Sequence, residues 1–190
     1  MEKPELYFPR DVEWREWLEI HHKNHLKGIY LILYKLETGV PSMRWEEAVK
    51  VALCYGWIDS TVKSLGDGKR RQYFCPRNPK STWSKLNKSY IAELEKSDLI
   101  HTSGWKTIEL AKETGVWAAM DDVDNGVIPP DLKKAFDSNT FAFENYQNFA
   151  PGYQKGYLSW LFGAKRPETR MKRISEIISY CIANSKQRQP

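Results

Sequence analysis

Cysteine is scarce in this chain, and its placement excludes two common kinds of structure. The sequence has three cysteines, which lie far apart at Cys54, Cys75 and Cys181. An odd number of widely spaced cysteines excludes a disulfide framework and a CxxC metal knuckle. Free thiols are typical of a reducing compartment, so we predict a cytoplasmic protein.

Long uncharged apolar runs and the common enzyme motifs are also missing. No run approaches the ~20 apolar residues that a membrane-spanning helix needs, so we predict no membrane span. The first residues, MEKPELYFPRDVEW, contain acidic side chains and no apolar core, unlike a secretory signal. The sequence contains no GxSxG, HExxH, P-loop or GxGxxG pattern, which leaves enzymatic activity with little support and implies no cofactor.

Aromatic residues are abundant, with 8 Trp and 10 Tyr in 190 residues. Large aromatic side chains are costly to leave in water, so most of them should lie in a core or line a groove. Hydrophobic residues make up 41% of the chain and charged residues 28%. This composition excludes disorder and is typical of one compact domain, or of two small halves that share a core.

Positive charge is concentrated at the C-terminal end. Residues 151–190 contain 8 Lys and Arg against 2 Asp and Glu, whereas residues 1–150 contain 21 against 22. The basic segment is either an anion, nucleic-acid or acidic-lipid surface, or a solvated helix face.

Residues 1–115 show alternating helix and strand patterns. The apolar run Gly28–Lys35 predicts a strand buried on both faces, and Trp57–Lys63 and Lys69–Pro76 predict a hairpin that turns at Leu65–Gly68. Helices are expected in three segments: Val12–Asn24 capped by Asp11, a helix capped by Ser42 and ending near Tyr55, and a helix from Thr82 or Ser84 to Lys96.

A further helix is expected at Ser103–Thr114. Residues 116–190 then predict helices almost throughout. The expected segments are Pro130–Ser138, Thr140–Asn148, Gly152–Gly163 and Pro167–Asn184, and the acidic segment Gly115–Pro129 predicts a loop or linker. We therefore predict an α+β fold with a small, mainly antiparallel sheet, three-stranded or slightly larger, covered by helices. An all-helical region follows, at residues 116–190, and we expect it to pack on residues 1–115 as one compact unit.

Several blocks of the sequence resemble the YdeI/OmpD-associated family, also called bacteriocin-protection proteins. The blocks, spread over nearly the whole chain, are Trp14–Leu18, Asn24–His25 and Lys27–Gly28, Glu47–Val49 and Ala52–Cys54, Gly56–Asp59, Val62–Leu65, Pro76–Arg77, Trp83–Lys85 and Asn87, Ala164–Arg170, and Arg173–Ile174. Two departures from the family pattern flank Arg77: Cys75 stands where the family has Thr, and Asn78–Lys80 is less basic. The resemblance implies protection against bacteriocins or antimicrobial peptides, and it implies no catalytic mechanism or cofactor.

The two predicted hairpin strands suggest a binding pocket. Trp57, Asp59, Thr61 and Lys63 alternate along one strand and should share a face. Arg77 and the start of the Ser84 helix follow the return strand, and an Arg beside free helix N–H groups forms an anion site. The predicted pocket for a small anionic ligand or peptide comprises Trp57, Asp59, Lys63, Arg77, Trp83, Ser84 and Asn87. Alternatively, Asp59–Arg77 or Asp59–Lys63 pairs and the Trp rings only lock the hairpin to the helices.

Two further sites have weaker support. Cys54 or Asp59 could serve an uncharacterised enzyme, but Cys54 falls on an apolar helix face, where a buried thiol is the better interpretation. His21 and His25 have a spacing that can bind zinc, but no third ligand is near them, so we predict no metal site.

The last predicted helix offers the alternative of nucleic-acid binding. Arg166, Arg170 and Arg173 fall on one helix face beside Lys165, and aromatic residues precede them. That face is either a nucleic-acid surface or simply solvated. The sequence does not fix the ligand or the oligomeric state.

Overall fold

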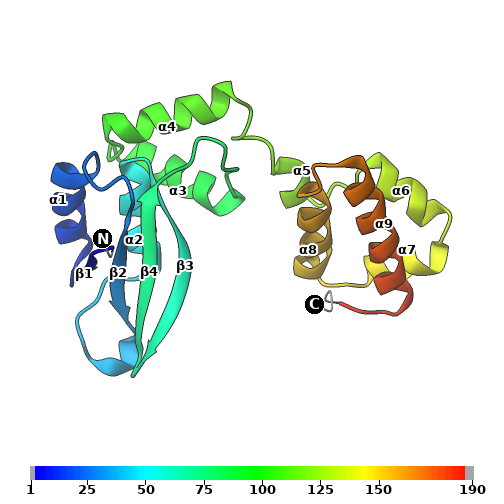
Figure 1. The fold of residues 1–190 in the computed structure, drawn as a ribbon, viewed down its shortest axis with the longest axis horizontal. Coiled ribbons are helices and arrows are strands. Elements are labelled where there is room, and N and C mark those ends of the chain that lie inside the picture. Colours follow the sequence, from blue (N-terminus) through cyan, green and yellow to red (C-terminus); the bar gives the residue numbers. More distant parts are fainter. Residues whose placement is uncertain (1–2, 187–190) are drawn as a thin grey trace. The chain divides into compact units, whose positions relative to one another are not determined.

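The computed structural model describes residues 3–186, and the chain divides into two compact units, Met1–Ala118 and Ala119–Pro190. The outermost ends of both predicted regions, residues 1–2 and 187–190, lie outside the described residues. The first unit combines a sheet with helices and the second is helical (Figure 1). This confirms the predicted α+β class.

The sheet has four strands in the order β1-β2-β4-β3. These are β1 (Glu5–Tyr7), β2 (Ile29–Tyr34), β3 (Trp57–Gly66) and β4 (Lys69–Pro76). As predicted, β2 is an interior strand, antiparallel to β4. The short strand β1 was not predicted, and it pairs with β2 in parallel, so the sheet is mixed.

The β3–β4 hairpin closes through a two-residue turn at Asp67 and Gly68. Their φ angles are 47° and 68°. Two successive residues with positive φ give a turn whose twist matches that of the paired strands, and Asp-Gly is among the sequences that adopt it most readily. The hairpin was predicted, and the structure extends β3 three residues beyond the predicted end at Lys63.

The helices of the first unit lie close to their predicted positions. They are α1 (Asp11–His21), α2 (Trp45–Cys54), α3 (Lys85–Lys96) and α4 (Thr102–Glu113), with a short 3-10 helix, η1 (Leu36–Thr38). Two predicted caps are wrong. Arg10 rather than Asp11 is the N-cap of α1, and Arg44 rather than Ser42 is the N-cap of α2. The Ser42 hydroxyl instead accepts a hydrogen bond from the Tyr34 backbone N–H, 3.0 Å away.

The helices cover one face of the sheet, which we call the inner face. Ile29, Leu31 and Leu33 of β2 are completely or almost completely buried on it. Trp14 of α1 lies edge-on to Phe74 of β4, and its indole N–H donates to a backbone carbonyl of α2. Figure 1 shows α2 lying against the strands on this side. The period-2 alternation of β2 and β4 puts their tyrosines on the opposite, outer face.

A β-bulge interrupts β3. Asp59 pairs with Phe74 and Val62 pairs with Gln72, so three steps along β3 match two steps along β4. The extra residue reverses the side-chain alternation beyond the bulge. Val62 to Ser64 therefore face opposite to what the sequence parity predicts, and a second register shift, between Ser64 and Gly66, restores that parity.

The second unit is built from α5 (Asp121–Asp124), α6 (Pro130–Asp137), α7 (Thr140–Gln147), α8 (Pro151–Phe162) and α9 (Pro167–Ile182). Its own core includes Leu132, Phe136, Leu161 and Ile177. The segment Gly115–Pro129, predicted as a loop or linker, contains the short helix α5, whose first turn carries acidic side chains that suit the positive end of a helix dipole. None of the helices formed by residues 3–186 has the length and apolar content needed to cross a membrane.

Gly104 allows a close helix contact that can be tested. A Cβ atom at this position in α4 would lie 2.2 Å from the Cys54 carbonyl oxygen, whereas one at Gly156 in α8 would meet nothing within 4 Å. Alanine normally stabilises a helix by ~1 kcal/mol over glycine. We expect Gly156→Ala to raise the unfolding free energy by up to about 1 kcal/mol, and Gly104→Ala to lower it by about 1–3 kcal/mol through overpacking. Chemical denaturation measures both, and a stabilised Gly104→Ala would contradict this packing.

Candidate functional site

Trp57, the first residue of β3, is a core residue and does not line an open pocket. It is 1% exposed, and its ring lies edge-on to Trp14 and Trp17 of α1. Its indole N–H donates to the His22 backbone carbonyl at 3.2 Å. The only polar atom of this side chain is thus satisfied within the protein, as buried Trp usually requires.

Asp59 joins the sheet to α2. One oxygen of its half-buried carboxylate, Oδ2, accepts a hydrogen bond from the Trp45 indole N–H and another from the Gln72 side-chain amide, each at 2.8 Å. Gln72 is 4% exposed and lies on the central strand β4. Hydrogen bonds to a carboxylate are shorter and stronger than neutral ones. Asp59 therefore fixes the indole of Trp45, the first residue of α2, against the sheet.

Lys63 lies on the other face of the sheet. It follows the bulge and pairs with Arg71, so it faces opposite to Asp59 and is exposed. The prediction that Lys63 shares a face with Asp59 is therefore wrong, because it assumed unbroken alternation along β3.

Arg77, the first residue after β4, is buried. It is 8% exposed, its guanidinium carbon lies 3.9 Å from the centre of the Trp83 ring, and its Nη2 donates to the Thr82 carbonyl. Within the described residues, its Nε and Nη1 are buried without a hydrogen-bond partner. Burial lowers the pKa of this guanidinium to about 10, and the charge of Asp59 opposes the shift. Arg77 thus stays protonated at neutral pH and holds the loop that leads to α3.

The remaining predicted pocket residues lie at the start of α3. Trp83 is 1% exposed and packs on the Trp117 ring, whereas Ser84 is the N-cap of α3. The Ser84 hydroxyl accepts from the backbone N–H of Asn87 at 3.2 Å. Ion pairs of Asp59 with Arg77 or Lys63 are not found among residues 3–186. The structure therefore brings Asp59 and Arg77 near each other without a salt bridge, and it buries both Trp rings.

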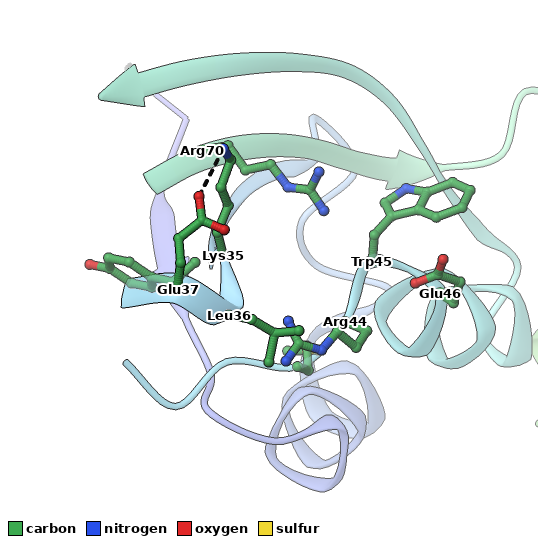
Figure 2. A pocket seen from close by; sticks show the side chains of 9 residues that line it. Lys35, Leu36, Glu37, Arg44, Trp45, Glu46 and Arg70 are labelled. Carbon is green, nitrogen blue, oxygen red and sulfur yellow. Dashed lines mark hydrogen bonds and ion pairs between the residues drawn. The ribbon is translucent and has the colours of Figure 1, made fainter. Parts of the chain in front are cut away.

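An open cleft lies beside Trp45 (Figure 2). It has a volume of about 350 Å³, and the lining residues are Tyr34–Glu37, Met43–Glu46 and Arg70. None of the seven residues predicted for the pocket lines it. Trp45 connects the two regions, because its ring forms a wall of the cleft while its N–H is bound to Asp59.

Two arginines of the cleft have no ion-pair partner, although the Glu46 carboxylate also lines the cleft. Lys35 pairs with Glu37 at 3.1 Å, and the Glu47 carboxylate, one turn into α2, accepts from the Arg44 backbone N–H. The guanidinium groups of Arg44 and Arg70 have neither an acidic partner nor a hydrogen bond to the part of the chain that the structure describes. Both side chains are half-buried. Figure 2 shows the Arg70 side chain reaching from β4 into the cleft. The geometry suits an anion.

Sequence patterns alone did not identify this cleft. Arg70 alternates with Gln72 and Phe74 along β4, so its side chain is on the inner face. A charged residue is unusual at such a position. A cation at an inward position of a strand is a signal that could have drawn attention to Arg70. Arg44 gives no such signal, because it lies in the segment leading into α2, and only the folded chain brings it near β4.

Two family models match the chain, one in each unit. The model described as "Domain of unknown function (DUF8412)" matches residues 6–107, more than half of the sequence. The chain belongs to the DUF8412 family. A second model, described as "Bacteriocin-protection, YdeI or OmpD-Associated" (OmdA), matches residues 125–184. No curated protein and no solved structure matches the chain.

The OmdA match confirms the resemblance noted in the sequence over part of the chain. The closing block, Ala164–Arg170 with Arg173–Ile174, lies inside the matched residues. The earlier blocks from Trp14 to Asn87 lie inside the DUF8412 region, whose description assigns no function. The cleft, Asp59 and Arg77 all belong to that DUF8412 region.

Within the OmdA region, two of the four predicted basic-surface residues have internal partners. Arg170 pairs with Asp131 of α6, and this pairing holds the pKa of the Asp131 carboxyl below its usual value. Arg173 donates to the Trp160 backbone carbonyl and lies 5.1 Å from the centre of the Trp160 ring. Lys165 and Arg166 are exposed between α8 and α9. The basic face therefore holds the helices together at two of its four positions.

Cys54 lies in the core of the DUF8412 region. It is fully buried, with Arg15 Nη2 3.4 Å from its sulfur. Burial raises the pKa of this thiol, and the Arg15 charge opposes the rise. A thiol with a raised pKa is a poor nucleophile at neutral pH.

The His21 and His25 rings both pack on Trp17, and residues 3–186 hold no group of three metal-ligating side chains.

A double-mutant cycle tests the Asp59–Trp45 bond. We expect Trp45→Phe and Asp59→Ala each to destabilise the fold, and their effects to be non-additive by about 1–3 kcal/mol, because each removes a hydrogen bond to a carboxylate, which has roughly that value. Urea denaturation of the four variants measures the coupling. Additivity within about 0.3 kcal/mol would show that the two side chains do not interact.

Thiol labelling tests the burial of the cysteines. Burial raises the pKa of Cys181 to about 12, and both Cys54 and Cys181 are fully buried, whereas Cys75 is partly exposed. Burial also raises the pKa of the Cys75 thiol, so exposure to the reagent sets the order of reaction at pH 8. With a thiol reagent at pH 8, we expect Cys75 to react first in the folded protein and the other two only after denaturation. Rapid labelling of Cys54 in the folded protein would revive it as a candidate nucleophile.

Proposed function

We propose that the chain is a binding protein for a small anionic ligand, held in the cleft between Arg44, Trp45 and Arg70. The observation that carries the proposal is a pair of half-buried guanidinium groups without partners in the described residues, facing one hollow. A charged group that loses part of its hydration without gaining a partner is costly. An anion bound in the cleft would supply the missing partner and offset that desolvation penalty.

The chemistry favours a carboxylate or a phosphate. A guanidinium presents paired N–H donors that match two oxygens of either group. The Trp45 ring offers an apolar wall on which a flat part of the ligand can pack. The volume, about 350 Å³, is at the lower end of the usual range for small-molecule sites. Either a small metabolite or the acidic side chains of a peptide fit this description.

In this proposal, Asp59 is a positioning residue. It holds the indole of Trp45 and thereby one wall of the cleft. Gln72 holds the same carboxylate from β4. Trp57, Arg77, Trp83, Ser84 and Asn87 then support the scaffold, and Lys63 belongs to the other face.

The proposed biological role is tolerance of bacteriocins or antimicrobial peptides. It draws on the description of the OmdA family, which matches residues 125–184. The ligand of the cleft would connect the DUF8412 region to that role. The cytoplasmic location expected from the sequence remains a prediction.

Calorimetric titration tests ligand binding. We expect inorganic phosphate, citrate or a small phosphate ester to bind the wild-type protein. Arg44→Gln and Arg70→Gln should each weaken binding about tenfold or more, because a hydrogen bond to a charged group has a value of roughly 1.5–3 kcal/mol. Arg166→Gln, an exposed arginine of the other unit, is the control. If Arg44→Gln and Arg70→Gln fold normally and bind as tightly as the control, the cleft is not the site.

A growth assay tests the biological role separately. Cells that lack the gene should become more sensitive to a panel of bacteriocins and cationic antimicrobial peptides. The wild-type gene should restore tolerance, and the Arg44→Gln/Arg70→Gln double variant should not. Equal restoration by the double variant would separate the cleft from protection.

A further inference from the structure

The outer face of the sheet carries a second surface, which the proposed function does not use. The register places Tyr7, Tyr30, Tyr34 and Tyr73 on this face, from three neighbouring strands. We call these four residues the tyrosine face. Figure 1 shows the strands β4 and β3 in front of α2, so helix α2 does not cover this side.

The four rings form two contacting pairs. Tyr30 and Tyr73 are 5.5 Å apart between ring centres, and Tyr7 and Tyr34 are also 5.5 Å apart, with an interplanar angle of 86°. Tyr7 is 40% exposed, and the other three are half-buried. Ile32, which the register places on the same face and opposite Tyr7, is only 5% exposed. Part of this aromatic surface therefore remains open to a partner.

Positive charge accompanies the rings. Lys3 Nζ lies 3.9 Å from the centre of the Tyr73 ring, and the Arg71 guanidinium carbon lies 4.5 Å from the centre of the Tyr30 ring. Beyond the bulge, Lys63 joins Lys69 and Arg71 on this face.

Little negative charge balances these cations. Glu5 of β1 pairs with Arg71 at 2.7 Å. Within residues 3–186, the side chains of Lys3, Lys63 and Lys69 have no acidic partner. A hollow of about 480 Å³ lies among Lys3, Pro4, Glu5, Tyr30 and Arg71.

We propose that the tyrosine face binds single-stranded nucleic acid. In such a complex, unpaired bases stack on the tyrosine rings, and the flexible lysines Lys3, Lys63 and Lys69 contact the phosphates. Aromatic rings on an open sheet, bordered by cations, are the combination that sequence-tolerant single-strand binding requires. A duplex keeps its bases inside and would leave the rings unused.

Charge complementarity favours this occupant over a second copy of the chain. In a two-fold symmetric dimer, the same basic face would meet itself, and like charges would repel across the interface. A strand of phosphates instead supplies the negative charge that this face lacks. The proposal is independent of the anion cleft, because Arg70 and Arg71 point to opposite faces of β4.

Fluorescence anisotropy with labelled ten-nucleotide oligo(dT) and oligo(rU) tests the proposal on the full chain. We expect binding at low salt, with a log–log salt slope of about −0.7 for each phosphate contacted. In the Lys63→Gln/Lys69→Gln variant, which changes one exposed and one half-buried lysine, the magnitude of that slope should fall by about 1.4. Tyr30→Leu should weaken binding about tenfold with the slope unchanged, because stacking is not ionic.

Further measurements keep the test decisive. Circular dichroism melting shows that each variant is folded, and ultraviolet crosslinking should map the nucleic acid to peptides that contain Tyr30 or Tyr73. Lys165→Gln/Arg166→Gln is the charge-matched control on the helical unit and should bind like the wild type. Arg44→Gln/Arg70→Gln should also keep oligonucleotide binding, which separates this surface from the cleft.

Four outcomes would overturn the proposal. The first is no anisotropy change at low salt. The second is a folded Tyr30→Leu variant that binds like the wild type, combined with a Lys63→Gln/Lys69→Gln variant whose salt slope is unchanged. The third is loss of binding only in Lys165→Gln/Arg166→Gln, which would assign the nucleic acid to the helical unit. The fourth is binding of heparin or anionic phospholipid vesicles as tight as that of the oligonucleotides, since those partners have no bases to stack.

Discussion

The candidate site depends on the two hydrogen bonds that the Asp59 carboxylate accepts. Two donors from different elements, the Trp45 indole of α2 and the Gln72 amide of β4, meet on the same oxygen. A half-buried carboxylate is stable only with such partners. Through this bond, the first residue of α2 is held against the sheet, and its ring becomes a wall of the cleft that Arg44 and Arg70 complete.

The two faces of one sheet offer two different chemistries. Alternation along β2 and β4 puts apolar side chains and Arg70 inside, and tyrosines and Arg71 outside. The bulge on β3 adds to this separation, because it moves Lys63 from the side of Asp59 to the tyrosine face. A single extra residue thus changes which surface gains a positive charge.

Patterns that depend on neighbouring residues were predictable, and long-range placement was not. The apolar run at β2, the Asp-Gly turn and the Ser84 cap each follow from local chemistry, and the fold class followed from them. The three-residue strand β1 is too short to show a period, and no residue type marks the bulge. The sequence predicts Trp57 and Trp83 as pocket residues, because an aromatic residue looks the same in sequence whether it is buried or lines a groove. Whether a ring is packed depends on α1 and on Trp117, both distant in the chain.

The most direct test of the account is nuclear magnetic resonance of the arginine Nε–H and tryptophan indole N–H signals during titration with inorganic phosphate. If Arg44 and Arg70 bind an anion beside Trp45, the signals of these three residues should shift together and saturate with one dissociation constant. The exposed Arg10 should show only a small, non-saturating change. Equal, non-saturating shifts at Arg10, Arg44 and Arg70, with the Trp45 signal unmoved, would contradict the proposed cleft.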